Sequence, residues 1–223
     1  LLLSASLLNA QATTKRDSAQ ALGKVTISGV TGRGSVRAAS GIDSAVLKAA
    51  APGTSALKAV ERIPGVNMQS VDGFGMYEWS NRITMRGFQT SQIGQTMDGI
   101  PLGDMSYGNW NGLGVGRAVD ASNLESTAVA QGSGALGTAS ANNLGGVVQY
   151  ATAEPAGKQQ FLLQQMGGQN SARRTLLRYD MGLKTFGGSN GVSAFMSVSR
   201  FDSDKWKGGG ERLSNFPGEQ DLL

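Results

Sequence analysis

The stretch RITMRGFQTSQIGQTMDGIPL, residues 82–102, decides the fold of this chain. Polar and apolar residues alternate over Arg82–Arg86, and this period of two predicts a β-strand that ends at Gly87. The run Gln92–Met97 leads into Asp98-Gly99, a dipeptide that favours the tight turn of a hairpin. The centre of the chain is therefore predicted to consist of short strands joined by tight turns.

Upstream of this stretch the pattern is helical. It favours a short helix over Ile42–Ala51, stopped by Pro52. A second helix is expected to begin near Thr54, a good N-cap, and to run through Arg62 until Pro64-Gly65 ends it.

Helical spacing places Leu57, Val60 and Ile63 on one face of the second helix, which predicts that they are core residues. Val66–Gln69 is the next strand candidate, and a loop is expected at residues 70–80. Further strands are predicted at residues 124–129 and 147–151, completing a small mixed domain that ends near residue 155.

Beyond Gly157 the chain alternates over longer segments, with the turn residues 187–191 between two runs and a weaker strand, Phe161–Met166, before them. In the first run an apolar face is formed by Thr175, Leu177, Tyr179, Met181 and Leu183, and a mostly charged face by Leu176, Arg178, Asp180, Gly182 and Lys184. Such segments are typical of a transmembrane β-barrel, apolar towards lipid and polar towards the lumen. A soluble antiparallel sheet gives the same alternation, so periodicity alone leaves both open.

Composition excludes several kinds of chemistry. Cysteine and histidine are absent, so disulfides, thiolate catalysis, His-ligated metal sites and His-dependent triads are excluded. The net charge of +4 comes from scattered rather than clustered Lys and Arg, which argues against nucleic-acid binding. Glycine accounts for 33 of 223 residues, about twice its average usage, which favours turns and close backbone approaches.

The two ends are informative. LLLSASLLNAQA, residues 1–12, is typical of the end of a signal peptide with a small-residue cleavage site, and the alternative is an apolar terminus of a soluble protein. Thr13–Arg37 is polar and glycine-punctuated, which predicts a flexible tail. At the other end Trp206–Leu223 stops without a closing element, and we expect the chain to be cut off there.

An enzyme is considered because Gly132–Gly137 fits the dinucleotide pattern G-x-G-x-x-G. A dinucleotide site needs a helix directly after those glycines, and residues 142–146, NNLGG, interrupt any helix there. Asp202 and Asp204 lie in a polar segment with no third partner, so solvated loop charges explain them better. We therefore expect no enzyme, no catalytic residue, no cofactor and no metal site.

Four segments, in order, resemble the plug domain of TonB-dependent outer-membrane receptors. They are a helix with a Pro-Gly-Val exit (residues 56–66), a strand ending in Arg-Gly-Phe (83–88), an Asp-Gly-hydrophobic-Pro turn (98–102) and a strand, glycine-rich loop and Gly-Gly-Val strand (124–148). The structural motif residues are Pro64, Gly65, Arg86, Gly87, Phe88, Asp98, Gly99, Pro101, Gly145 and Gly146. The glycine-rich segment lacks the family's Arg-Gly-Pro, which weakens any expectation of a specific ion pair there.

The resemblance implies an α+β plug domain, a small mixed sheet with short helices, followed by the start of an antiparallel transmembrane β-barrel. The expected divisions are residues 1–12, a signal-peptide remnant; 13–39, a flexible periplasmic tail; 40–156, the plug; and 157–223, the first barrel strands. The implied location is the outer membrane of a Gram-negative bacterium, with the plug and tail facing the periplasm and the barrel strands facing lipid.

The resemblance also implies active transport of a scarce ligand, most commonly an iron chelate such as a ferric siderophore, although no residue chooses among ligands. TonB, with its inner-membrane energising complex, would add a strand to an exposed β-prone segment of the tail. The TonB box would comprise Lys24, Val25, Thr26, Ile27, Ser28 and Gly29. A plain linker is the alternative for this segment.

Aromatic residues and methionines gather in two glycine-rich loops, although aromatics make up only 6% of the chain. The predicted substrate contacts are Phe74, Met76, Tyr77, Trp79, Met105, Tyr107 and Trp110. Packing of these loops against the barrel wall is the alternative. For the whole protein, the runner-up is an exported, non-transporting plug-like binding module or adhesin.

Overall fold

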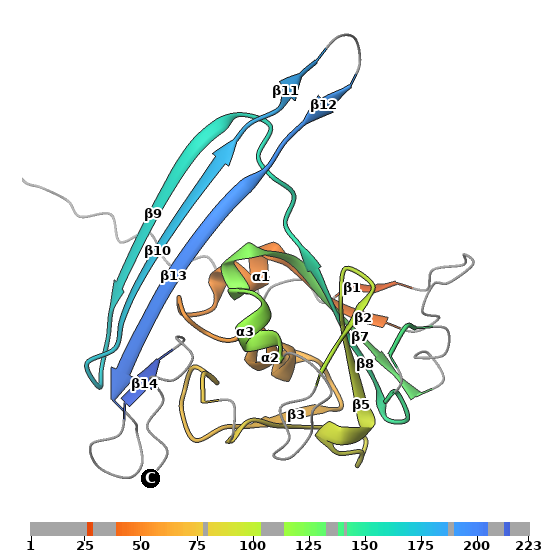
Figure 1. The fold of residues 1–223 in the computed structure, drawn as a ribbon. Helices are drawn as coiled ribbons and strands as arrows, with labels where there is room; N and C mark the ends of the chain where they lie inside the picture. The colour runs from red at the N-terminus through yellow and green to blue at the C-terminus, as the bar shows by residue number, and fades with distance from the viewer. Residues whose placement is uncertain are drawn as a thin grey trace, which may run out of the picture.

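A computed structural model describes residues 26–28, 39–77, 80–103, 114–132, 138–140, 142–186, 190–204 and 212–214. Within them a mixed sheet with short helices on one face lies beside a long, separate antiparallel sheet (Figure 1). We call the first the central sheet and the second the outer sheet.

The central sheet has six strands in the order β1-β2-β7-β8-β5-β6. Its strands are β1 (Thr26–Ser28), β2 (Ala39–Asp43), β5 (Ile93–Met97), β6 (Ile100–Leu102), β7 (Leu124–Gln131) and β8 (Gly146–Thr152). β5 and β8 run parallel and the other neighbours antiparallel, so the sheet is mixed, as the sequence predicts. The hairpin of β3 (Val66–Gln69) and β4 (Arg82–Met85) forms a separate pair.

The helices are short: α1 (Ser44–Ala49), α2 (Ala56–Ala59) and α3 (Val115–Ala118), with 3₁₀ turns η1 (Val60–Arg62), η3 (Thr90–Gln92) and η4 (Ala121–Asn123). None of the helices in the described part of the chain is long and apolar enough to cross a membrane.

Both predicted helices start later than expected. Ile42 belongs to β2, where it pairs with Thr127, and Asp43 caps α1 by accepting a hydrogen bond from the Val46 backbone N–H at 3.1 Å. Ser55 rather than Thr54 caps α2, accepting from the Lys58 N–H at 3.1 Å. The predicted helix through Arg62 tightens into the 3₁₀ turn η1 after Ala59.

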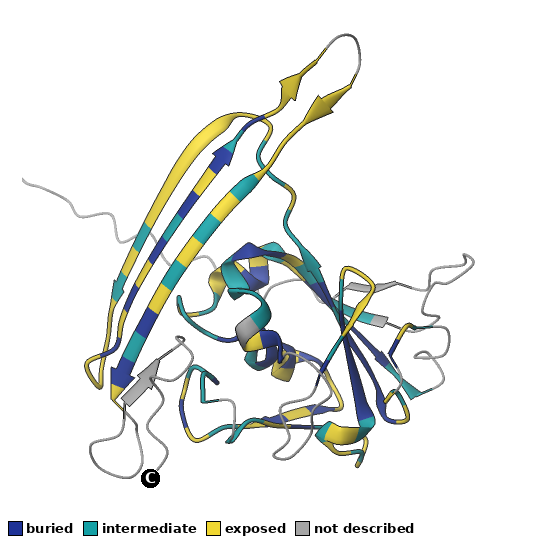
Figure 2. Cartoon of the chain, in the orientation of Figure 1, coloured by how far each residue is buried: buried dark blue, intermediate teal, exposed yellow. Residues whose placement is uncertain are grey.

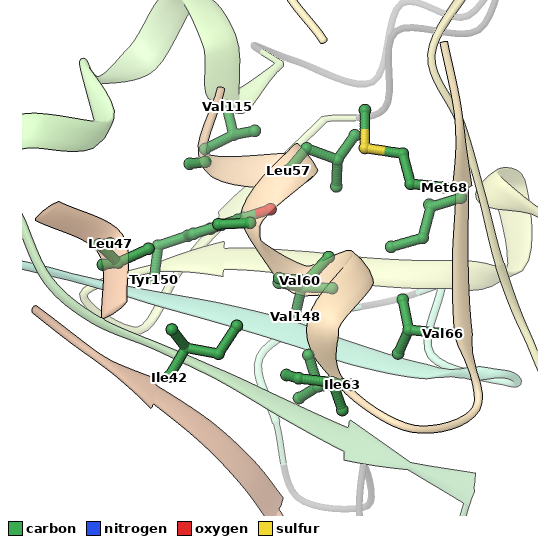
Figure 3. Close-up of a cluster of buried hydrophobic side chains, with 14 of the residues drawn as sticks. Ile42, Leu47, Leu57, Val60, Ile63, Val66, Met68, Val115, Val148 and Tyr150 are labelled. Carbon is green, nitrogen blue, oxygen red and sulfur yellow. The ribbon is translucent and has the colours of Figure 1, made fainter. Parts of the chain in front are cut away.

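The core lies between the helices and the central sheet (Figure 3). Leu57, Val60 and Ile63 are buried there, which confirms the face predicted from helical spacing. Tyr150 of β8 is also buried; within the described residues its hydroxyl has no hydrogen-bond partner, and burial raises its pKa. Burial of this apolar face holds helices that are too short to be stable alone.

One turn explains why two of the motif residues are needed. Asp98 and Gly99 both have positive φ, +50° and +81°, as a two-residue hairpin turn requires, and they join β5 to β6. The Asp98 carboxylate also accepts from the Thr152 N–H and hydroxyl at 3.0 and 2.8 Å. The predicted Asp-Gly turn is confirmed.

The Arg-Gly-Phe and Gly-Gly-Val motifs meet in space. A Cβ atom added to Gly145 would overlap the Cβ of Phe88. The Gly145 N–H donates to the Gln92 carbonyl at 2.8 Å, and Gly146 has a φ of +140°. Only glycine fits this contact, because the backbone of one segment lies directly against the side chain of the other.

The outer sheet has the order β14-β13-β10-β9. Its strands are β9 (Gln159–Gly167), β10 (Arg173–Met181), β13 (Phe195–Asp204) and β14 (Arg212–Ser214), and the short pair β11 (Lys184–Thr185) and β12 (Gly191–Val192) extends beyond it. The three alternating segments predicted from sequence correspond to β9, β10 and β13, although the second run, expected from Val192, begins as β13 only at Phe195. The first alternating run is shorter than expected, because β10 ends at Met181 and Gly182 has a φ of +72°.

Buried and exposed residues alternate along β10 and β13 of the outer sheet (Figure 2), and charged residues are among the buried ones. Arg174, Arg178 and Asp180 on β10 are buried against the central domain. Large apolar side chains are exposed on the other face, with Met196 and Val198 of β13 at 74% and 57%. The covered face of the outer sheet therefore carries Arg174, Arg178 and Asp180 together with the apolar Leu176 and Phe201, while the opposite face exposes large apolar side chains.

Candidate functional site

Two arginines of β10 connect the outer sheet to the central domain. Arg174 is only 2% exposed, and its Nη2 donates to the Asp120 carboxylate and to the Ser122 hydroxyl, both at 2.7 Å. Asp120 is the N-cap residue of η4 and also accepts from the Ser122 N–H at 2.9 Å. A charge-assisted contact thus joins residues that lie 54 positions apart in the chain.

Arg178 makes the second connection, further along β10. Its guanidinium donates to Asn123 Oδ1 at 3.3 Å and to the Glu154 carbonyl at 3.4 Å. It pairs with Asp180 at 2.9 Å and lies 3.9 Å from the centre of the Phe195 ring. The outer sheet is therefore held at η4 and at the segment that links the two sheets.

Arg174 keeps the carboxyl group of Asp120 ionised. Burial alone would raise the pKa of this carboxyl, but the nearby charge of Arg174 and its hydrogen bond outweigh burial and lower the pKa below the ordinary 3.8. The ion pair is therefore intact at neutral pH.

A cavity of about 390 Å³ lies at the same boundary. It is lined from the central domain by Gly53, Met76 and Asp120, and from the outer sheet by Arg174, Ser197 and Phe201. Phe201 also meets Phe74 edge to face, with ring centroids 5.0 Å apart. Phe74 of the predicted loop therefore lies against the outer sheet.

The structure places three of the predicted substrate contacts in this loop. Phe74, Met76 and Tyr77 are all half-buried: Phe74 packs on Phe201 and Met76 lines the cavity. For Phe74 this is the packing against the barrel strands that the sequence left open as an alternative. That the seven predicted residues contact a ligand stays a prediction. Trp79, Met105, Tyr107 and Trp110 lie outside the described residues.

The predicted TonB box overlaps β1. Thr26–Ser28 pair with β2 through Ile27 opposite Ser40, at the end of the central sheet's strand order. Lys24, Val25 and Gly29 lie outside the described residues, as do residues 1–12. Membership of a box stays a prediction.

The resemblance to plug domains also implies ion pairs of Arg86, Glu61, Arg62 and Asp98 with one another or with the barrel. Glu61 instead pairs with Lys58 at 2.6 Å, and Asp98 accepts from Thr152. Among the described residues no group of three or more acidic, His or Cys side chains could hold a metal ion.

The polar connections were not found from sequence. Alternation places Arg178 and Asp180 on one face, but nothing local to residues 120–123, DASN, indicates an arginine partner. The one available signal was an Asp in an N-cap pattern next to a predicted strand.

The fold, with the outer sheet held against the central domain, agrees with one protein family. Residues 31–147, more than half of the chain, match the family model described as TonB-dependent Receptor Plug Domain. The chain belongs to this family, and the predicted fold class is confirmed. The plug is a domain of receptors that transport rather than catalyse, as the sequence predicts. From here the central domain is called the plug.

Solved structures agree on the fold. The FpvAI–pyocin S2 complex matches with a TM-score of 0.57 and 20% identity, covering 78% of this chain and 21% of that one. The pyoverdine outer membrane receptor FpvA from Pseudomonas aeruginosa PAO1 matches with a TM-score of 0.56 and 18% identity, covering 79% and 24%.

The ferric enterobactin receptor PfeA of Pseudomonas aeruginosa matches with a TM-score of 0.55 and 16% identity, covering 74% and 25%. The chain thus spans between a fifth and a quarter of the length of these solved proteins. No curated protein sequence matches the chain.

Proposed function

We propose that this protein is an outer-membrane receptor that imports a scarce ligand with energy delivered through TonB. The observation that carries the proposal is the burial pattern of the outer sheet. Arg174, Arg178 and Asp180 are covered, while large apolar side chains such as Met196 and Val198 are exposed on the opposite face, which suits a membrane wall whose lumen is filled by protein.

The ligand class is an iron chelate such as a ferric siderophore. Support comes from the similar structures, which include a receptor bound to pyoverdine and a receptor for ferric enterobactin. At 16–18% identity these likenesses carry the fold, so the ligand is part of the proposal.

TonB engages the segment Lys24–Gly29 by strand addition. Strand addition grips main-chain N–H and C=O groups, so it needs a β-prone segment with one unpaired edge. Thr26–Ser28 already adopt an extended strand at the end of the central sheet's strand order, which is compatible with that use.

Uptake by cells tests the proposal. The full-length receptor is expressed in a Gram-negative strain lacking its own siderophore receptors, and ⁵⁵Fe-labelled pyoverdine, enterobactin and hydroxamate chelates are offered at 4 °C for binding and at 37 °C for import. We expect one chelate class to bind at both temperatures and to enter only at 37 °C in cells that have TonB.

The runner-up, an exported binding module or adhesin, gives a different result. Such a protein would retain a ligand or cell-surface target at both temperatures and import nothing, with or without TonB. Binding without TonB-dependent import of any chelate would therefore contradict the transport proposal and favour the runner-up.

A further inference from the structure

The loop Ser70–Asn81, between β3 and β4, is organised by one buried carboxylate. Asp72 is 4% exposed. Its Oδ1 accepts from the backbone N–H groups of Phe74 and Met76 at 2.9 and 3.0 Å. Its Oδ2 accepts from the Tyr77 N–H and from the Ser70 hydroxyl, both at 3.0 Å. Four donors of one loop thus converge on one side chain.

The rest of the loop is fixed to the plug around this centre. The Phe74 carbonyl accepts from the Ser55 N–H at 2.8 Å, next to the start of α2. Asn81 donates to the Gly75 carbonyl at 2.7 Å. Gly75 has a φ of +68°, and a Cβ there would lie 2.8 Å from the Ser55 hydroxyl. Hydrogen bonds from inside the loop therefore fix the shape of residues 70–77.

This shape orients the loop's large side chains. Phe74 packs on Phe201 of the outer sheet and Met76 lines the cavity between the two sheets. Tyr77, the last residue whose N–H reaches Asp72, stays half-buried at the far end of the turn. Without the carboxylate, three neighbouring N–H groups would lose their acceptor and the turn would open.

We propose that Asp72 is a positioning residue for ligand binding: its carboxylate holds the loop in the shape that presents Tyr77 to the ligand. The inference rests on the proposed function, because the ligand is the chelate named there. A preformed loop binds more tightly than one that must be ordered on binding, since the ordering cost is met in folding.

Asp72→Asn in the full-length receptor separates the two oxygens. An amide accepts only through its oxygen, so it can serve either the Phe74 and Met76 pair or the Tyr77 and Ser70 pair. One end of the loop must be released. Asp43→Asn is the matched control, because asparagine caps α1 as well as aspartate does.

Two readouts are combined. Hydrogen exchange of the loop amides measures the release directly, and we expect faster exchange at residues 74–77 in Asp72→Asn only. These 223 residues contain no cysteine, so once any cysteine elsewhere in the full-length receptor has been replaced by serine, a fluorophore on Gln69→Cys reports binding of ferric pyoverdine and ferric enterobactin. We expect the affinity for the chelate that binds to fall on the order of tenfold, and the control to be unchanged.

Ser70→Ala is the second variant in case Asp72→Asn does not fold. It removes the hydroxyl that donates to Asp72 Oδ2 at 3.0 Å and accepts from the Asp72 N–H at 3.4 Å but keeps the carboxylate, so it predicts a smaller loss in the same direction. Faster loop exchange with unchanged affinity would overturn the positioning role while leaving the proposed function intact. Failure of the wild-type receptor to bind any iron chelate would instead contradict the proposed function and this inference with it.

Discussion

Arg174 of β10 and Asp120 of η4 lie 2.7 Å apart, with the arginine side chain 1% and the aspartate side chain 18% exposed. The pair joins β10 of the outer sheet to the start of η4 in the plug. Buried pairs of this kind gain little over an apolar contact, but they are costly to break on one side. We therefore expect the pair to fix the position of the outer sheet on the plug more than to add net stability to the fold.

Asp120→Asn should destabilise the plug. The substitution leaves the buried Arg174 charge with neutral acceptors alone, the new amide oxygen, Ser122 and Gln164, and the expected loss is about 3 kcal/mol of unfolding free energy. Urea unfolding of the full-length receptor in detergent, followed by tryptophan fluorescence, measures it.

The matched control is Asp202→Asn, which breaks the more exposed Arg200–Asp202 pair, 2.9 Å long, on the other face of the sheet. That pair should contribute less than about 1 kcal/mol. Equal losses in the two variants would contradict a special role for the Arg174–Asp120 contact.

The same contact predicts a pH dependence. The pKa of Asp120 is lower in the folded plug than its ordinary 3.8, so the folded state binds this proton more weakly than the unfolded state does. The stabilisation is complete above the ordinary pKa and is lost as pH falls through the folded value. The stability difference between wild type and Asp120→Asn should therefore be constant near neutrality and shrink below about pH 4. A difference that grows on acidification would contradict this sign.

Gly145→Ala should lower the stability of the plug although it adds only one methyl group. The added methyl would overlap the Phe88 side chain, and overpacking of this kind costs about 1–3 kcal/mol. Gly157→Ala is the control, because nothing lies within 4 Å of its Cβ position. Thermal melting of the two variants decides the point, and a Gly145→Ala receptor as stable as wild type would show that the two motifs are not in contact.

Met196→Arg tests the apolar face. This side chain is 74% exposed on β13, and an arginine facing hydrocarbon costs about 2–4 kcal/mol near the bilayer centre. We expect lower yield of heat-modifiable, membrane-inserted receptor, whereas Asn190→Arg beside β12 should insert normally. Normal insertion of Met196→Arg would argue that this face meets water.

Much of the fold was predictable from sequence because its signals are local. Alternation identified β3, β4, β10 and β13, and the Asp98-Gly99 turn needs no distant partner. Helix ends were missed for the opposite reason. The local pattern around Ile42 favours a helix, but in the structure Ile42 pairs with Thr127, 85 positions later, in the central sheet.

The candidate site was less predictable. The charged face of β10 was visible in the sequence, but whether it faces water or protein depends on the plug that covers it. The convergence of loop N–H groups on Asp72 likewise depends on backbone geometry that composition does not encode.

Ile27→Pro in the full-length receptor tests the central claim, TonB-dependent import, most directly. Proline removes a main-chain donor from the segment that TonB would pair with, and Ile27→Val keeps that donor. Binding at 4 °C and import at 37 °C of the ⁵⁵Fe-labelled chelate are compared in cells with and without TonB. The account predicts that Ile27→Pro retains binding and imports no more than cells lacking TonB, while Ile27→Val imports normally. Import by Ile27→Pro at the wild-type rate would contradict it.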